Sequence, residues 1–243
     1  MQETVELETP VEAPAKKAQF AKVYDRTNIP IKAVLCDIDG TLIDLHMRLQ
    51  AIKDTFKKMG LNPQLPDEEL KKRTFGLKSV VYFRNIFPQR AADAEKFRDL
   101  MHQIIIADPR YTVLLPTVKE TMDWFKKRGI KIGVITTGDR KIVNHILKVI
   151  RLPVDVAITA DDVRNVKPHQ EGVLLSCSKL GVRPQECIMI GDDIVDIEAG
   201  KNGGVQKTVG ITTGKYKRDV LSTANPDFII DKFSELVKII EKM

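Results

Sequence analysis

The chain has 243 residues, of which 43% are hydrophobic and 30% charged, and its formal net charge is +6. This balance is typical of a globular protein rather than a disordered or membrane one, and no apolar run approaches the roughly 18 residues that a membrane span needs. Basic residues are interleaved with acidic ones, and neither zinc-finger spacing nor an aromatic RNA-binding motif is present. We therefore expect a protein that enters no membrane and binds no nucleic acid.

The first 30 residues mix Glu, Pro, Ala and Lys without apolar periodicity, which predicts a poorly ordered extension over residues 1–30. Acidic residues stand where a secretory or transit peptide would be basic. The three cysteines are odd in number and widely spaced in apolar surroundings, which favours packing roles in a reducing compartment. The expected location is the cytoplasm.

The first predicted element is a short buried strand over residues 31–36, which ends at Asp37 and Asp39. The apolar period then becomes helical, and nothing before residue 108 reads as a strand. Helices are predicted at 45–59, 67–75, 79–87 and 89–107. We interpret residues 46–113 as an inserted α-helical cap domain.

Strands and helices alternate in the rest of the chain. The predicted strands are 131–136, 154–159, 187–190, 206–209 and 227–230, and the predicted helices are 117–128, 139–150, 170–180, 193–201 and 232–242. Because parallel neighbours need crossover helices, this alternation predicts an α/β fold with a doubly wound parallel sheet. Its core would comprise residues 31–45 and 114–243.

Polar side chains follow several of the predicted strands. In doubly wound sheets ligands bind beyond the carboxyl ends of the strands, so these side chains are expected to share one site. They are Asp37 and Asp39, Thr136 and Thr137, Asp192 and Asp196, with Lys167 from the loop after the third strand.

Crowded carboxylates repel one another unless a cation neutralises them, and oxygen ligands without His or Cys suit Mg²⁺. A phosphoryl group completes the charge balance. Its oxygens would meet the hydroxyl of Thr136, the backbone N–H groups around Thr137 and Gly138, and the ammonium of Lys167. Asp37 could then attack phosphorus, and Asp39 could transfer protons to and from the leaving group and water.

The sequence resembles the haloacid dehalogenase superfamily, in particular its phosphatases with a helical cap, from about Ile31 to the C-terminus. The matching motifs are Asp37-Ile38-Asp39-Gly40-Thr41-Leu42, Thr136 after Val134-Ile135, Lys167-Pro168, and Gly191-Asp192-Asp193-Ile194-Val195-Asp196. The resemblance implies a Rossmann-like core, Asp37 as nucleophile and metal ligand, and Asp39 as acid and base that also offers its backbone carbonyl to Mg²⁺. It further implies Asp192 as a direct ligand and Asp196 as a supporting one.

Asp193 and Lys78 are interpreted from their local sequence context rather than from the resemblance. Asp193 is interpreted as a helix-start residue rather than a metal ligand, because Asp is favoured at that position. Lys78 is the predicted substrate contact from the cap, since it follows Gly76 at a helix junction. The four histidines are scattered without ligand spacing, so packing or solvated positions are expected for them.

The predicted function is Mg²⁺-dependent hydrolysis of a small phosphate monoester, with a small phosphorylated metabolite as the partner. A phosphomutase would use the same Asp37 and Asp39 but return the phosphoryl group to a sugar, and the sequence separates the two poorly. A dehalogenase would not need Asp39. A non-catalytic binding protein on the same scaffold is disfavoured by the intact catalytic set.

Overall fold

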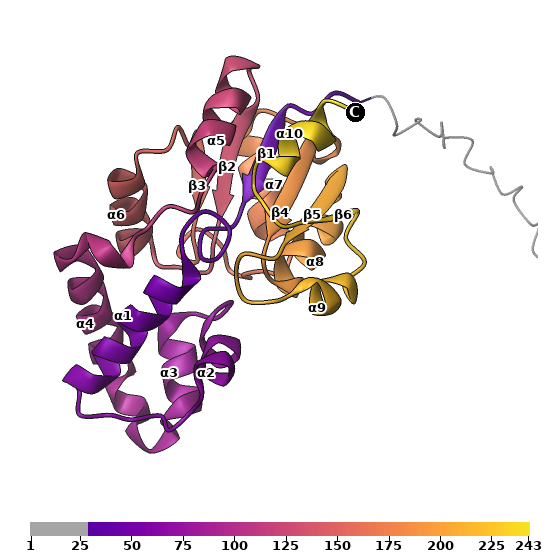
Figure 1. Ribbon diagram of the computed structural model, residues 1–243. Coiled ribbons are helices and arrows are strands. Elements are labelled where there is room, and N and C mark those ends of the chain that lie inside the picture. Colours follow the sequence, from indigo (N-terminus) through magenta and orange to yellow (C-terminus); the bar gives the residue numbers. More distant parts are fainter. Residues whose placement is uncertain (1–28) are drawn as a thin grey trace, which may run out of the picture.

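The computed structural model describes residues 29–243, which form a six-stranded sheet with helices on both faces and a separate group of helices beside it (Figure 1). The extension predicted for residues 1–30 lies outside the described residues except for its last two. Within the described part of the chain, no helix combines the length and apolarity needed to cross a bilayer.

The sheet is parallel throughout, in the order β3-β2-β1-β4-β5-β6. Its strands are β1 (Ala33–Cys36), β2 (Lys131–Ile135), β3 (Val156–Ile158), β4 (Cys187–Gly191), β5 (Lys207–Ile211) and β6 (Phe228–Ile230). The central strands β1 and β4 are buried along their whole length, as expected for parallel strands covered on both faces.

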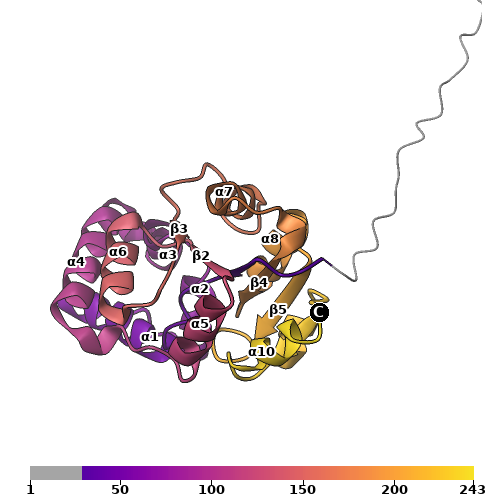
Figure 2. The ribbon, with the colours of Figure 1, turned by 90° about the horizontal axis from the view of Figure 1, so that it is seen from above.

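The helices that alternate with the strands are α5 (Val118–Lys127), α6 (Arg140–Ile150), α7 (Glu171–Leu180), α8 (Ile194–Asn202), α9 (Arg218–Ser222) and α10 (Glu235–Ile240). Helices α7 and α8 lie on one side of the sheet, and α5 and α10 lie on the other (Figure 2). Alternate residues of β1 contribute to separate hydrophobic clusters, with Val34 in one and Leu35 in the other. The predicted doubly wound parallel fold is therefore confirmed.

The second group of helices, residues 45–111, is called the helical insertion below. It contains α1 (Leu45–Lys58), α2 (Asp67–Thr74), α3 (Ser79–Ile86), α4 (Ala94–Ala107) and short 3₁₀ turns at Pro88–Asp93 and Pro109–Tyr111. Aromatic rings form its centre, where Phe97 lies 4.9 Å from the ring centroids of both Phe56 and Phe83. Stacked apolar rings of this kind stabilise a small helical unit beyond their buried area.

The two connections between the helical insertion and the sheet run side by side. Ile43 and Leu114 form an isolated antiparallel bridge. The amide of Asp44 donates to the carbonyl of Val113 at 2.8 Å, and Leu115 donates to Leu42 at 2.9 Å. The chain thus leaves the core and returns to it at one place, close to the predicted boundaries at 45/46 and 113/114. The division into two domains itself stays a prediction.

The clearest differences from the predicted elements are at three places, and β3 (Val156–Ile158) is also shorter than the predicted strand 154–159. The helix predicted at 89–107 begins as a 3₁₀ turn, because Arg90 has φ −118° and ψ 21°, and the α-helix starts only at Ala94. Helix α9 was not predicted, since its five residues are too few to show a period. The closing helix is shorter than the predicted 232–242.

Candidate active site

The ends of β1, β2 and β4 bring the predicted polar residues to one pocket. These three strands are neighbours in the sheet, so the residues that follow them meet at its carboxyl edge. Two turns contribute from outside these strand ends, one with Lys167 and one with Lys215. The pocket is lined by all the predicted core-side residues, Asp37, Asp39, Thr136, Thr137, Lys167, Asp192 and Asp196.

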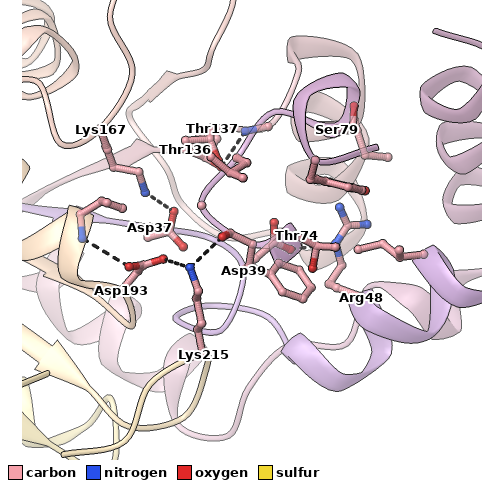
Figure 3. Close-up of a pocket in the computed structure, with 18 of the residues that line it drawn as sticks. Asp37, Asp39, Arg48, Thr74, Ser79, Thr136, Thr137, Lys167, Asp193 and Lys215 are labelled. Atoms are coloured by element: carbon pink, nitrogen blue, oxygen red, sulfur yellow. Dashed lines mark hydrogen bonds and ion pairs between the residues drawn. The ribbon is translucent and has the colours of Figure 1, made fainter. Parts of the chain in front are cut away.

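Three carboxyl groups form the centre of the pocket. Asp37, Asp192 and Asp196 each offer an oxygen atom, and these atoms lie within 4.8 Å of one another. All three residues are buried, with 7%, 3% and 1% of their surface exposed. Lys167 Nζ lies 2.5 Å from Asp37 Oδ1 and 2.5 Å from Asp196 Oδ1. One ammonium therefore bridges two of the three carboxyl groups, and Figure 3 shows its contact with Asp37.

Burial controls the protonation of this cluster. It raises the pKa of Asp37 to about 7, although Lys167 acts in the opposite direction. Burial and the neighbouring acids raise the pKa of Asp192, and burial likewise raises that of Asp196. Burial alone would lower the pKa of Lys167, but the two carboxylates that it contacts raise it above the usual value. Lys167 is therefore positively charged. Its single charge does not balance three carboxylates, so the acids favour their protonated forms.

The acidic cluster fits a hard divalent cation. Its donors are carboxylate oxygens, their spacing allows one ion to be shared, and their charge exceeds that of the single lysine between them. Asp37, Asp192 and Asp196 would hold Mg²⁺, and Asp39 could add its backbone carbonyl as the resemblance implies. The chemistry of the donor set thus agrees with the predicted cofactor.

Backbone features hold Asp192 close to the first strand end. Gly40 has φ +84°, and a Cβ atom there would lie 2.3 Å from Asp192 Oδ2. Only glycine combines this conformation with so close an approach. Asp192 also accepts hydrogen bonds from Thr41 Oγ1 at 3.3 Å and from the amide of Lys215 at 2.6 Å. The carboxyl group is therefore fixed before any ligand binds.

Asp193 begins α8, as the sequence predicts. Its side chain accepts from the amide of Val195, and its own amide donates to Asp196 Oδ2 at 3.1 Å, so the two acids form a capping box. The second carboxyl oxygen of Asp193 pairs with Lys215 Nζ at 2.7 Å. Capping also orients Asp196 toward Lys167, which links helix formation to the geometry of the site.

Asp39 is held by a residue that the sequence analysis did not identify. Arg48 Nε, from the first turns of α1, donates to Asp39 Oδ1 at 2.7 Å. The side chain of Arg48 is only 8% exposed, whereas that of Asp39 is 24% exposed. Arg48 lies three residues after Leu45 and four before Ile52, so a basic residue within an apolar stripe was the available signal.

The helical insertion closes the pocket with Arg48, Ser79, Tyr82, Met101 and His102. Lys78 is not among the lining residues, and its Nζ donates to the carbonyl of Ala160 at 3.3 Å. The structure therefore brings together the predicted core residues but does not bring Lys78 to them. The space left between the lining side chains is about 70 Å³, far below the roughly 300–1,000 Å³ of pockets for drug-sized ligands.

The sequence is similar to a known family of hydrolases and to individual members of it. The sequence model of the haloacid dehalogenase-like hydrolases matches residues 34–226. The pyrophosphatase PpaX of Bacillus velezensis is 34% identical over 224 residues, which cover 88% of this chain and 98% of that protein.

Solved structures give the same result. A chain from Bacteroides fragilis assigned to the haloacid dehalogenase-like hydrolases has a TM-score of 0.73 at 28% identity, over 85% of this chain and 99% of that one. A predicted phosphoglycolate phosphatase from Haemophilus somnus has a TM-score of 0.70 at 25% identity, over 86% and 97% of the two chains. The protein thus belongs to the haloacid dehalogenase-like hydrolase family, as one of its phosphatases.

Proposed function

We propose that this phosphatase hydrolyses a small phosphorylated metabolite with the help of Mg²⁺, through a phosphoryl group carried on Asp37. The observation that supports this most is the buried cluster of Asp37, Asp192 and Asp196 around the ammonium of Lys167. The names of the relatives make pyrophosphate and phosphoglycolate the first substrates to assay.

In the first step, an oxygen of Asp37 attacks phosphorus and the bond from phosphorus to the leaving oxygen breaks. Lys167 neutralises charge beside Asp37, which reduces the repulsion between the carboxylate and the phosphate. The leaving oxygen takes a proton from Asp39, whose carboxyl group Arg48 orients. The alcohol or phosphate product then leaves.

In the second step, water attacks the phosphorus of the aspartyl-phosphate. Asp39 accepts a proton from this water, and the bond between phosphorus and Asp37 breaks to release inorganic phosphate. The hydroxyl of Thr136 and the backbone around Thr137 line the side of the pocket where the phosphoryl oxygens would lie. Bound Mg²⁺ would offset negative charge on the phosphoryl group and on the carboxylates.

The substitution Asp37→Asn tests this proposal. The amide keeps the shape of the side chain but is a poor nucleophile, so the release of inorganic phosphate should fall by roughly 10⁴-fold. Asp219→Asn is a suitable control, because Asp219 is exposed and outside the pocket. Thermal unfolding of both variants would show that the fold is kept.

Two outcomes would contradict the proposal. Turnover by Asp37→Asn at the parental rate would exclude Asp37 as the nucleophile. Conversion of a sugar phosphate to its isomer without release of inorganic phosphate would identify a phosphomutase instead. The predicted role of Lys78 is tested in the same assay, where Lys78→Ala should raise KM if that lysine contacts the substrate.

A further inference from the structure

Two of the three cysteines are in contact on one face of the sheet. Cys177 lies on the inner side of α7, and Cys187 is the first residue of β4. Their Sγ atoms are 3.6 Å apart, and both residues belong to the hydrophobic cluster between α7 and the sheet. Cys36, the third cysteine, belongs to the cluster on the opposite face. The chain therefore holds one pair of thiols and one separate thiol that serves as an internal control.

The pair is close enough to form a disulfide after a small movement. Bonded sulfur atoms are about 2.05 Å apart, so the two Sγ atoms need to approach by about 1.5 Å. Only ten positions separate the two residues in the sequence, and the segment between them is at the surface, with Gly181, Arg183 and Gln185 exposed. Side-chain rotation and a slight shift at the end of α7 can supply the approach.

A small oxidant can reach the pair through this end of α7. Cys177 is 2% exposed and Cys187 is 0% exposed, so the reaction requires a local opening. Helix α7 lies on the outside of the sheet (Figure 2), and its residues Leu174 and Ser178 are exposed. Local opening at the end of an outer helix costs less free energy than global unfolding. Such an opening uncovers Cys177 while the central strand β4 stays in place.

The two thiols differ in how easily they lose a proton. The hydrogen bond with Cys187 lowers the pKa of Cys177, although burial acts in the opposite direction. The same hydrogen bond and burial raise the pKa of Cys187, whose Sγ also donates to the carbonyl of Arg183 at 3.4 Å. Burial likewise raises the pKa of Cys36. Because the thiolate is the reactive form of cysteine, Cys177 is the expected nucleophile of the pair.

We infer that Cys177 and Cys187 are a redox-active dithiol, which a hydroperoxide converts into an intramolecular disulfide with Cys177 as the attacking sulfur. The contact between the two sulfur atoms carries this inference, which does not depend on the proposed phosphatase reaction. Packing alone, which the sequence predicts for these cysteines, requires no contact between two sulfurs. Transient disulfides of this kind serve as redox sensors in reducing compartments.

The reaction takes two electrons from the pair in two steps. The Cys177 sulfur attacks one oxygen of the hydroperoxide, the O–O bond breaks, and Cys177 becomes a sulfenic acid while water or an alcohol leaves with the thiol proton. The Cys187 sulfur then attacks the Cys177 sulfur, and the S–O bond breaks. The leaving hydroxide takes the proton of Cys187 and departs as water. Two thiols and one hydroperoxide thus give one disulfide, one water and one alcohol or second water.

The experiment treats the complete, reduced chain with hydrogen peroxide under conditions that oxidise free glutathione completely. Remaining thiols are blocked with iodoacetamide, and tryptic peptides are analysed by mass spectrometry. Trypsin cleaves after Lys179, which lies between Cys177 and Cys187, so a disulfide keeps their two peptides joined. We expect joined peptides from a protein that runs as a single chain on a non-reducing gel, with Cys36 blocked by iodoacetamide. Dithiothreitol should restore both thiols of the pair.

Single variants test which sulfur attacks. In Cys187→Ala, Cys177 should react within about twofold of its parental rate, and dimedone should trap its sulfenic acid. Cys177→Ala should slow the oxidation of Cys187 by at least tenfold, roughly as expected for a thiol that keeps its proton. Ser178→Ala changes an exposed neighbour on α7 and should form the disulfide at the parental rate.

The parent chain decides the inference even if a variant does not fold. Blocking of both Cys177 and Cys187 by iodoacetamide after peroxide treatment would show that they only pack. A disulfide between two molecules, or oxidation of Cys36 to the same extent as the pair, would also overturn the inference, because the reaction would not depend on the contact between the two sulfurs. Faster oxidation of Cys187 than of Cys177 in the single variants would overturn the assignment of the attacking sulfur.

Discussion

Lys167 supplies one positive charge to the cluster of three buried carboxyl groups formed by Asp37, Asp192 and Asp196. Its ammonium contacts Asp37 and Asp196, while Asp192 relies on Thr41 and on the amide of Lys215. The remaining negative charge has no countercharge within the cluster. Burial therefore favours the protonated form and raises the pKa of Asp37, Asp192 and Asp196. Either protons or an external cation can neutralise these carboxylates. Protonation and metal binding are therefore alternatives at this site.

This competition predicts how stability depends on pH. Between the ordinary pKa of 3.8 and the raised value of about 7, folded Asp37 holds a proton that the unfolded chain has released. Without metal, the free energy of unfolding should fall as the pH rises through this range. Mg²⁺ should stabilise the protein more at pH 8 than at pH 5. At pH 8, a Mg²⁺ concentration 100 times the Kd at that pH should raise the free energy of unfolding by about 2.7 kcal/mol.

Urea unfolding at the two pH values, with and without Mg²⁺, measures the effect. Asp192→Asn is the informative comparison, because it removes one proposed ligand and should abolish most of the stabilisation by Mg²⁺ at pH 8. Equal stabilisation of the parent at both pH values would show that the cation binds elsewhere.

The sequence was sufficient to predict the pocket residues that follow the strands of the sheet, but not those that the helical insertion contributes. Asp37, Thr136 and Asp192 follow strands, and the topology of a parallel sheet fixes where strand ends meet. Arg48 and Ser79 depend instead on how the helical insertion packs against the core, which no local pattern encodes. Lys78 was predicted as the substrate contact from its place after Gly76 alone, and the packing of the insertion directs its amine to the carbonyl of Ala160 instead.

At the level of elements, α1 joins the helical insertion to the end of β1, where Asp37 and Asp39 lie. Its N-cap is Asp44, whose Oδ1 accepts from the amides of His46 at 2.7 Å and Met47 at 3.3 Å. Arg48 is the fourth residue of α1, at the end of its first turn, and holds Asp39. The start of this one helix thus links the fold of the insertion to the position of Asp39, the proposed general acid.

Asp44→Ala should lower the free energy of unfolding by about 1 kcal/mol, because two amides at the start of α1 lose their acceptor. It should also lower kcat, since the first turn carries Arg48. Urea denaturation and a phosphate-release assay measure the two effects. Glu198→Ala, an exposed change within α8, should stay within about 0.5 kcal/mol of the parent. Stability unchanged by Asp44→Ala would show that the cap is dispensable.

Elements with a clear period were predictable, and short or irregular ones were not. The strands of the sheet and helices α1 and α5 showed their apolar spacing in the sequence. The 3₁₀ turn at Pro88–Asp93 did not, because one residue with non-helical angles interrupts an otherwise helical pattern. Helix α9 packs against β5 and β6, so tertiary contacts rather than sequence period account for it.

At the scale of the whole molecule, polar contacts hold the helical insertion over the core. Lys215 Nζ pairs with Asp193 and also donates to the carbonyl of Phe75 at 2.9 Å, in the turn between α2 and α3. Gly76 in that turn has φ +86°, and a Cβ atom there would lie 2.8 Å from Asp193 Oδ2. The same loop that carries Lys215 therefore contacts Asp192, Asp193 and the insertion.

Lys215→Met should loosen this closure while leaving the sheet intact. Amides at residues 75–78 should exchange with solvent about tenfold faster, because one charged donor to the turn is lost. Hydrogen-exchange mass spectrometry measures this, with β1 and β4 as internal references. Lys217→Met, at an exposed neighbour, should leave exchange unchanged. Parental exchange rates in Lys215→Met would mean that packing alone closes the pocket.

The hydrogen-bonded pair of connections at Ile43 and Leu114 restricts how the two parts can separate. Two strands joined side by side resist sliding and twisting, because either motion breaks the bonds between Asp44 and Val113 and between Leu115 and Leu42. Bending across the pair breaks none of them. Any opening of the helical insertion would therefore be a bending about one axis, and closing it would return Arg48 to the same position beside Asp39. A site formed by two parts that bend in this way would keep the accuracy of a rigid one.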